Sequence, residues 1–85
     1  MREVTIYTIP YCPYCTAAKR LLASKKAAFR EIDVGGDPAA RRALADRAGG
    51  RTTLPQIFIG DVHVGGCDEL YALEQEGGLD PLLQA

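Results

Sequence analysis

Two cysteines, Cys12 and Cys15, stand two residues apart where a predicted strand gives way to a predicted helix. An apolar stretch over residues 4–7 precedes them, and the pair opens a helical segment over residues 16–26 whose apolar periodicity already starts at Pro13. Two thiols at this spacing can close a small disulfide, and the unpaired N–H groups of a helix N-terminus favour a thiolate. Because a thiolate held beside a second thiol is the working part of a disulfide exchanger, the pair predicts redox chemistry.

Cys67, the third cysteine, lies far along the chain, between Gly66 and Asp68. Three cysteines are too few, and odd in number, for a disulfide scaffold. In a reducing compartment a Cys-x-x-Cys pair is more often catalytic or metal-binding than structural, so a zinc site completed by Cys67 and His63 is the competing interpretation. Zinc-binding pairs usually recur at close, regular spacing, and Pro-Tyr between the cysteines is unusual in them. We therefore expect no metal site, and a surface position for His63.

The size and composition of the chain limit the functions that it can have. Its 85 residues allow one domain, over residues 1–85, with a modest core. Ten basic against eleven acidic residues give a net charge of -1, which argues against nucleic acid or an anionic membrane as the main partner. The chain starts without the apolar core of a signal peptide, and no apolar run approaches the ~20 residues of a membrane span. We expect a monomer in the cytoplasm.

Four short segments have the β-branched and aromatic residues, or the alternation, of strands. They are residues 3–8, 29–34, 56–59 and 62–64. The last two are joined by the tight turn Gly60-Asp61 and form an antiparallel hairpin. The first two are separated by a helix, so they must be parallel with a right-handed crossover.

Helices are predicted between and after these strands. Asp37 followed by Pro38 is a good start for a second helix, which Gly49-Gly50 would end. Asp68 is expected to cap a third helix, and leucines over residues 79–83 predict a short tail helix. The fold class is therefore α/β, with a mixed four-stranded sheet flanked by helices on both faces. The cysteine pair would lie beyond the carboxyl end of the first strand, where such sheets place their sites.

Three motifs in this order resemble those of the glutaredoxin family. They are Cys12-Pro13-Tyr14-Cys15 at the first helix, Thr53-Leu54-Pro55 before the third strand, and Gly65-Gly66-Cys67-Asp68 before the third helix. The resemblance covers nearly the full length of the chain and is closest to the small bacterial dithiol type. It implies a thioredoxin-like fold, with glutathione as co-substrate and no bound cofactor. The implied protein substrates are glutathionylated or disulfide-bonded proteins.

The resemblance also implies a role for each matching residue. Cys12 matches the exposed nucleophile of the family, and Cys15 matches its resolving thiol. Pro55 matches a cis-proline beside the pair, the backbone of Leu54 would pair with the cysteinyl part of glutathione, and Asp68 would hold its γ-glutamyl ammonium. Further residues expected at the glutathione site are Tyr14, Thr53, Gly66 and Cys67.

The chain departs from the family pattern at Ile9. Many glutaredoxins carry a lysine three positions before the nucleophilic cysteine, and Ile9 removes a cation that would assist the thiolate and the glycyl carboxylate of glutathione. We expect another positive partner for that carboxylate, with Arg42 as the first choice and Arg51 as the second. A surface ion pair contributes only ~0–1 kcal/mol, so the change should weaken glutathione binding without abolishing it.

The leading hypothesis is an enzyme, a glutathione-dependent thiol-disulfide oxidoreductase that reduces mixed disulfides and protein disulfides. A second hypothesis is an electron donor to ribonucleotide reductase that is served by thioredoxin reductase, but such relatives usually carry a tryptophan that this chain lacks. A third is an iron–sulfur cluster carrier bound through Cys12 and glutathione. Family members of that kind generally have a single cysteine followed by Gly-Phe-Ser, and the sequence from Pro13 to Cys15 differs from this.

Overall fold

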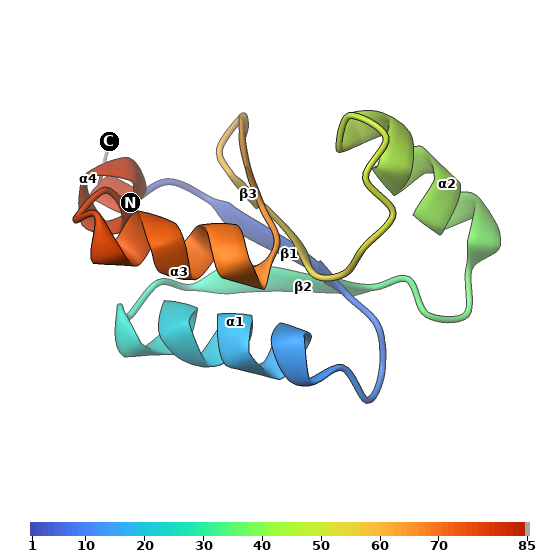
Figure 1. Ribbon diagram of the computed structural model, residues 1–85, viewed down its shortest axis with the longest axis horizontal. Coiled ribbons are helices and arrows are strands. Elements are labelled where there is room, and N and C mark those ends of the chain that lie inside the picture. The colour runs from blue at the N-terminus through green and yellow to red at the C-terminus, as the bar shows by residue number, and fades with distance from the viewer. Residues whose placement is uncertain (85) are drawn as a thin grey trace.

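A four-stranded sheet with the strand order β2-β1-β3-β4 forms the centre of the protein in the computed structural model, which describes residues 1–84 (Figure 1). The elements in chain order are β1 (Val4–Thr8), α1 (Pro13–Ser24), β2 (Phe29–Asp33), α2 (Pro38–Arg47), β3 (Gln56–Ile59), β4 (Val62–Gly65), α3 (Cys67–Gln75) and α4 (Leu79–Gln84). Strand β1 is parallel to β2 and antiparallel to β3, which is antiparallel to β4. The predicted mixed sheet and the predicted order of elements are confirmed.

The side chains of β1 alternate between the two faces of the sheet, and each face has its own apolar cluster. Val4 and Ile6 belong to the larger cluster, with residues of β3, α1, α3 and α4. On this face α1 and α3 lie side by side (Figure 1). Tyr7 packs instead against the smaller cluster on the other face, where Leu44 of α2 is buried beside Phe58 of β3. Burying a side chain of this size contributes roughly 1.5–3 kcal/mol, so both layers hold the sheet in place.

The starts of α1 and α2 follow the sequence prediction, whereas the start of α3 differs from it. Helix α1 begins at Pro13, where the predicted helical periodicity starts, with Cys12 as its N-cap, because proline is well suited to the first helical position. Helix α2 begins as predicted, and the Asp37 carboxylate accepts a hydrogen bond from the Ala40 N–H at 3.0 Å. The prediction that Asp68 caps α3 was wrong, because the N-cap is Gly66 and the helix starts one residue before Asp68.

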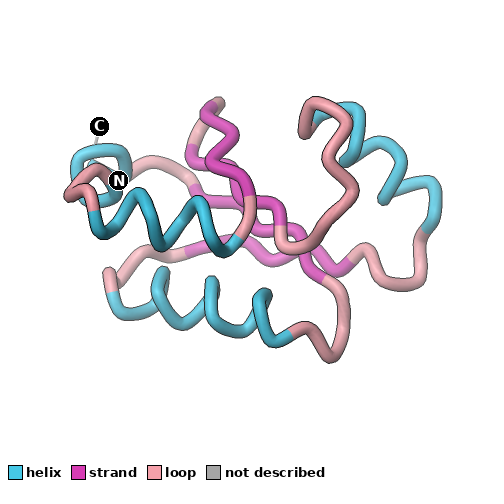
Figure 2. The backbone as a smooth tube through the Cα atoms, in the orientation of Figure 1, coloured by secondary structure: helices cyan, strands magenta, loops and turns pink. Residues whose placement is uncertain are grey.

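One end of the sheet is flanked by loops, and the other end lies near the two chain termini. Figure 2 shows the loops that follow β1 and precede β3 on the side away from both chain termini. At the terminal side, the Arg2 N–H donates a hydrogen bond to the Leu83 carbonyl at 2.8 Å, which ties the start of the chain to α4. Within residues 1–84, no helix is long and apolar enough to span a membrane. The loops at the free side bring the predicted site residues together.

Candidate active site

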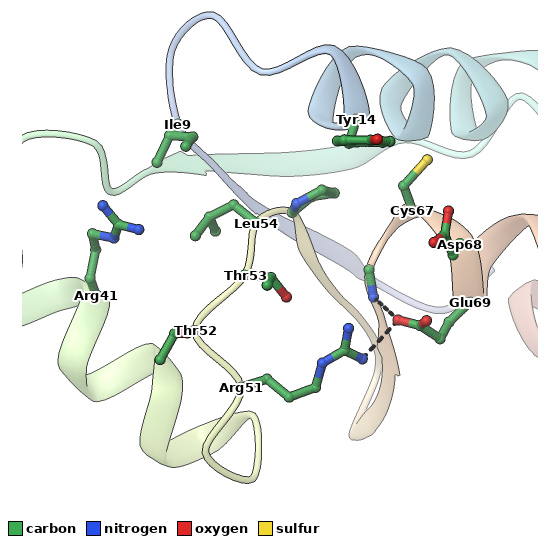
Figure 3. Close-up of a pocket in the computed structure, with 12 residues that line it drawn as sticks. Ile9, Tyr14, Arg41, Arg51, Thr52, Thr53, Leu54, Cys67, Asp68 and Glu69 are labelled. Carbon is green, nitrogen blue, oxygen red and sulfur yellow. Dashed lines mark hydrogen bonds and ion pairs between the residues drawn. The ribbon is translucent and has the colours of Figure 1, made fainter.

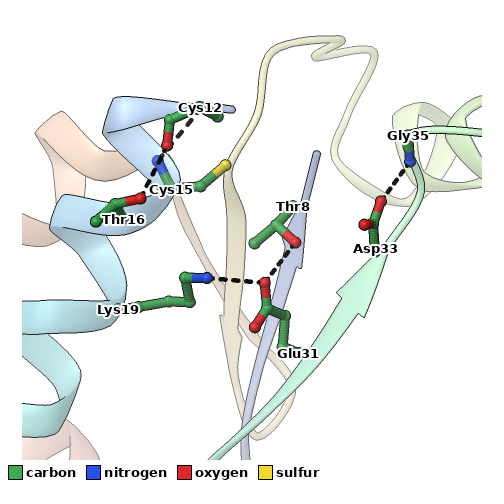
Figure 4. A network of polar contacts seen from close by, with 8 residues as sticks. All are labelled: Thr8, Cys12, Cys15, Thr16, Lys19, Glu31, Asp33 and Gly35. Atoms are coloured by element: carbon green, nitrogen blue, oxygen red, sulfur yellow. Dashed lines mark hydrogen bonds and ion pairs between the residues drawn. The ribbon is translucent and has the colours of Figure 1, made fainter. Parts of the chain in front are cut away.

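The side chain of Cys12 accepts a hydrogen bond at the start of α1. Its Sγ accepts the backbone N–H of Cys15 at 3.3 Å, as the side chain of an N-cap residue does (Figure 4). Cys12 is half-buried, whereas Cys15 is only 2% exposed, and both are free thiols. A sulfur that is reachable and accepts a helix N–H is arranged as a nucleophile, because a charged sulfur accepts such a bond better than a neutral one.

The second thiol of the pair has a different environment. Burial raises the pKa of Cys15 to about 11, and the neighbouring Cys12 sulfur adds to the rise. The backbone of Ile9 and the positive charge of Lys19 act in the opposite direction. Cys15 is therefore held as a neutral thiol near neutral pH, as the sequence predicts for a residue one turn into the helix.

A hollow of about 440 Å³ lies beside the cysteine pair and is formed by the loops that precede β3 and α3 (Figure 3). Its lining residues are Ile9, Tyr14, Arg41, Arg51, Thr52, Thr53, Leu54, Pro55, Gly66, Cys67, Asp68 and Glu69. Seven residues of the predicted glutathione site are among them, and Arg42 is not. Cys12 is connected to this hollow through the Leu54 carbonyl oxygen, which lies 4.0 Å from its Sγ.

The loop that carries Thr53, Leu54 and Pro55 is held by buried polar groups. The Leu54–Pro55 peptide bond is cis, as the family resemblance implies. The side chain of Gln56, which is fully buried, donates to the Thr53 carbonyl at 2.8 Å and to the Thr53 hydroxyl at 3.3 Å. Because a buried amide is costly unless its hydrogen bonds are made, Gln56 fixes Thr53 at the wall of the hollow.

His63 supports the same loop from β4 and is half-buried, so the predicted surface position holds for only part of its side chain. Its Nε2 lies 2.7 Å from the Gln56 Oε1, and its ring stacks on Phe58 with centroids 4.8 Å apart. The position of His63 on a short edge strand did not reveal that one side of its ring would lie against the sheet. Within residues 1–84, no three His, Cys, Asp or Glu side chains are grouped in a way that could hold a metal ion.

Glu69 is a site residue that the sequence analysis missed. Its Oε1 accepts the Gly66 N–H and an Arg51 N–H, each at 2.7 Å, so it joins two walls of the hollow (Figure 3). These two donors lower the pKa of Glu69, with the Gly66 bond as the larger cause. A glutamate three residues after an N-cap is a known capping position and could have revealed this role once Gly66 was recognised as the cap.

Of the two neighbouring arginines on α2, Arg41 rather than Arg42 lines the hollow. Arg42 lies on a smaller hollow of about 200 Å³ beside it, which it shares with Arg41 and Arg51. Successive helical residues point about 100° apart, so a choice between them depends on the rotation of α2 about its axis. Arg51, the second choice for a positive partner, lines both hollows, but it is paired with Glu69.

Tyr14, Cys67 and Asp68 line one end of the hollow. Figure 3 shows the Cys67 sulfur on the side of α3 that faces α1 and Tyr14, and Asp68 follows Cys67 in α3. Tyr14 is 63% exposed and Cys67 is 9% exposed. Burial, followed by the charge of Asp68, raises the pKa of the Cys67 thiol. Cys67 is therefore a neutral wall residue, whereas Tyr14 and Asp68 are open to a ligand.

A dithiol at a strand-to-helix junction, beside a cis-proline loop at one end of a mixed sheet, defines a thiol-disulfide oxidoreductase. Residues 4–64 match the sequence model of the family described as Glutaredoxin. Two known proteins with high similarity are bacterial. The chain is 55% identical to Glutaredoxin 3 of Escherichia coli strain K12 over 84 residues, which are 99% of this chain and 100% of the relative. It is 61% identical to glutaredoxin from Brucella melitensis, whose solution structure superimposes with a TM-score of 0.86 over 98% of this chain and 89% of that one.

A third comparison is with the crystal structure of the buckwheat glutaredoxin–glutathione complex. It is 30% identical in sequence and has a TM-score of 0.89, covering 98% of this chain and 77% of that one. The chain belongs to the glutaredoxin family and has its thioredoxin-like fold.

Proposed function

We propose that this protein is a glutathione-dependent thiol-disulfide oxidoreductase that reduces glutathione mixed disulfides and protein disulfides. The observation that carries the proposal is the Cys12 sulfur, which caps α1 and stands beside the hollow of about 440 Å³. The structural likeness to a glutaredoxin described as a glutathione complex supports glutathione as the ligand. We expect the protein to act in the cytoplasm, where glutathione keeps thiols reduced.

The hollow offers a group of suitable chemistry for each part of glutathione. The backbone of Leu54, close to Cys12, would pair with the cysteinyl amide. The exposed carboxylate of Asp68 suits the γ-glutamyl ammonium. For the glycyl carboxylate we now propose Arg41, because it lines the hollow and, unlike Arg51, has no carboxylate partner among the described residues. Opposite charges at both ends of the ligand would also fix its direction.

The reaction needs two exchanges. The Cys12 thiolate attacks the glutathione sulfur of a mixed disulfide, the protein thiol leaves, and a disulfide between Cys12 and glutathione is formed. A second glutathione thiolate then attacks the glutathione sulfur of this intermediate, which releases Cys12 and oxidised glutathione. One free glutathione is therefore consumed for each mixed disulfide, because the other half of the oxidised glutathione comes from the substrate. Alternatively, Cys15 attacks Cys12 and forms the internal disulfide.

The test is reduction of a small glutathione mixed disulfide with glutathione and glutathione reductase as the electron supply. We expect activity with this supply, and Cys15→Ser should keep it within roughly threefold, because the second glutathione can replace the resolving thiol. Reduction of protein disulfides by Cys15→Ser should fall much further. Little activity of the unaltered protein, restored when thioredoxin reductase replaces glutathione, would overturn the proposal in favour of the ribonucleotide reductase donor hypothesis.

The two arginines of α2 provide a matched pair for the carboxylate partner. We expect Arg41→Gln to raise the KM for glutathione about two- to fivefold, as the loss of a partly exposed ion pair of up to about 1 kcal/mol would do. Arg42→Gln removes the same charge from the adjacent residue and should change the KM less. The measurement is the KM for glutathione of each variant at low and high salt, since the Arg41 effect should shrink as salt screens it. A larger effect of Arg42→Gln would restore the original expectation.

A further inference from the structure

The dithiol route places opposing demands on Cys15. A buried thiol is poorly ionised, yet Cys15 must become a thiolate before it can attack the disulfide between Cys12 and glutathione. Cys15 is 2% exposed, so water cannot freely stabilise its charge. The positive end of α1 is already used by Cys12, which accepts the Cys15 N–H. Another source of positive charge near Cys15 would therefore help the internal step.

Lys19 supplies such a charge from the next turn of α1. It follows Cys15 by four residues, and side chains at this spacing lie on the same face of a helix. Figure 4 shows the Cys15 sulfur and the Lys19 ammonium on the side of α1 that faces the sheet. The positive charge of Lys19 lowers the pKa of Cys15 against the effect of burial.

The ammonium of Lys19 is fixed by a contact that spans three elements. Its Nζ lies 3.0 Å from the Glu31 Oε2 on β2, and the same oxygen accepts the Thr8 hydroxyl of β1 at 2.8 Å. Thr8 is 2% exposed and cannot move to solvent, so it anchors the carboxylate. Ile6 is the register partner of Glu31, which makes Thr8 a diagonal neighbour of Glu31 on the same face of the sheet.

The groups near Cys15 differ in whether they favour or oppose ionisation of its thiol. Helix α1 presents the Cys12 sulfur, which opposes ionisation of Cys15, and the Lys19 ammonium, which favours it. From the loop after β1 comes the Ile9 backbone, which also favours the thiolate. The charged group that β2 places on this side is Glu31, and its carboxylate forms an ion pair with Lys19. Lys19 is thus the positively charged side chain that lowers the pKa of Cys15, against the larger effect of burial.

Resting on the proposed function, we propose that Lys19, fixed by Glu31 and Thr8, is a positioning residue that promotes formation of the Cys15 thiolate and so sets the rate of the internal exchange. In that step the Cys15 thiol loses its proton to water, and the thiolate attacks the Cys12 sulfur. The bond between Cys12 and glutathione breaks, the Cys12–Cys15 disulfide forms, and the leaving glutathione thiolate takes a proton from water. Reduction of a protein disulfide uses the same attack of Cys15 on Cys12, with the protein thiolate as the leaving group, so it would depend on Lys19 more than reduction of small mixed disulfides does.

The test follows both steps separately. Reduced protein is mixed with oxidised glutathione, quenched with acid at set times, and analysed by mass spectrometry for the glutathione adduct and the internal disulfide. We expect Lys19→Gln to slow conversion of the adduct roughly two- to fivefold at pH 7, less than the tenfold change that one full pKa unit would give. The pH at which conversion reaches half its maximum should also rise. Lys19→Arg keeps the charge and should restore most of the rate.

Arg20→Gln is the matched control, since it removes a positive charge from the exposed neighbouring position of α1. Equal conversion rates and superimposable pH profiles for Lys19→Gln and the unaltered protein would overturn the proposal. So would a lower rate with no change in the pH profile and a lower thermal midpoint, which would indicate a structural role only. Failure of the unaltered protein to form any adduct would instead refute the proposed use of glutathione, so the two failures are distinguishable.

Discussion

Replacement of Cys12 by serine is expected to lower the glutathione-coupled reduction of a mixed disulfide by roughly 10³-fold or more, because the reaction loses its nucleophile. Neither remaining cysteine can substitute for it. Cys15 is 2% exposed and Cys67 is 9% exposed, and burial is the main cause of the raised pKa of each thiol. A serine hydroxyl is hardly ionised at neutral pH and would not attack a disulfide. Activity would be measured in the coupled assay together with Cys15→Ser, which makes the same chemical change three residues away.

The fold should survive this substitution, which makes the result easy to interpret. Cys12 is the N-cap of α1, and serine is among the best residues at that position because its oxygen accepts the N–H that the sulfur now accepts. The thermal midpoint of Cys12→Ser should therefore equal or slightly exceed that of the unaltered protein. A variant that folds normally and keeps more than a tenth of the activity would show that another group is the nucleophile.

The sequence predicted the structure best where the local residue pattern allows only one secondary structure or one position in the fold. The alternation of Val4, Ile6 and Thr8 in the core-facing positions of β1 requires a strand with a buried face, and the observed burial follows it. Asp37 before Pro38 specified the start of α2. The cysteine pair had to lie at the end of β1, because a parallel β-α-β unit places its crossover there. Local pattern and topology were enough for these features.

The missed or displaced residues depend on how separate elements meet. Whether Arg41 or Arg42 faces the hollow depends on the rotation of α2, and both residues are equally compatible with its sequence pattern. Glu69 gained its role because Arg51, eighteen residues earlier, lies within hydrogen-bond distance of it. His63 became half-buried because Phe58 of the neighbouring strand lies under its ring. Such contacts between distant segments are set by tertiary packing and leave little trace in the local sequence.

Replacement of Gly65 by alanine is expected to destabilise the protein by about 2–4 kcal/mol, for two reasons that act together. Gly65 has a φ of +114°, a conformation that is strained for any residue with a side chain. A Cβ atom there would also come within 2.6 Å of the Glu69 Oε1 and 2.8 Å of the Arg51 Nη1. These flexible groups could move aside, but only by giving up the hydrogen bonds that join Gly66, Glu69 and Arg51.

Gly50 is the matched control for Gly65, because it separates backbone strain from loss of these contacts. Its φ is +92°, but a Cβ atom built there meets nothing within 4 Å. Gly50→Ala should therefore cost only the strain, about 1–2 kcal/mol, and should leave the KM for glutathione close to that of the unaltered protein. Gly65→Ala should lose more stability in urea denaturation and raise that KM, since the residues that it displaces line the hollow. Equal losses of stability and an unchanged KM in the two variants would mean that the Arg51–Glu69–Gly66 contacts stabilise neither the fold nor the ligand site.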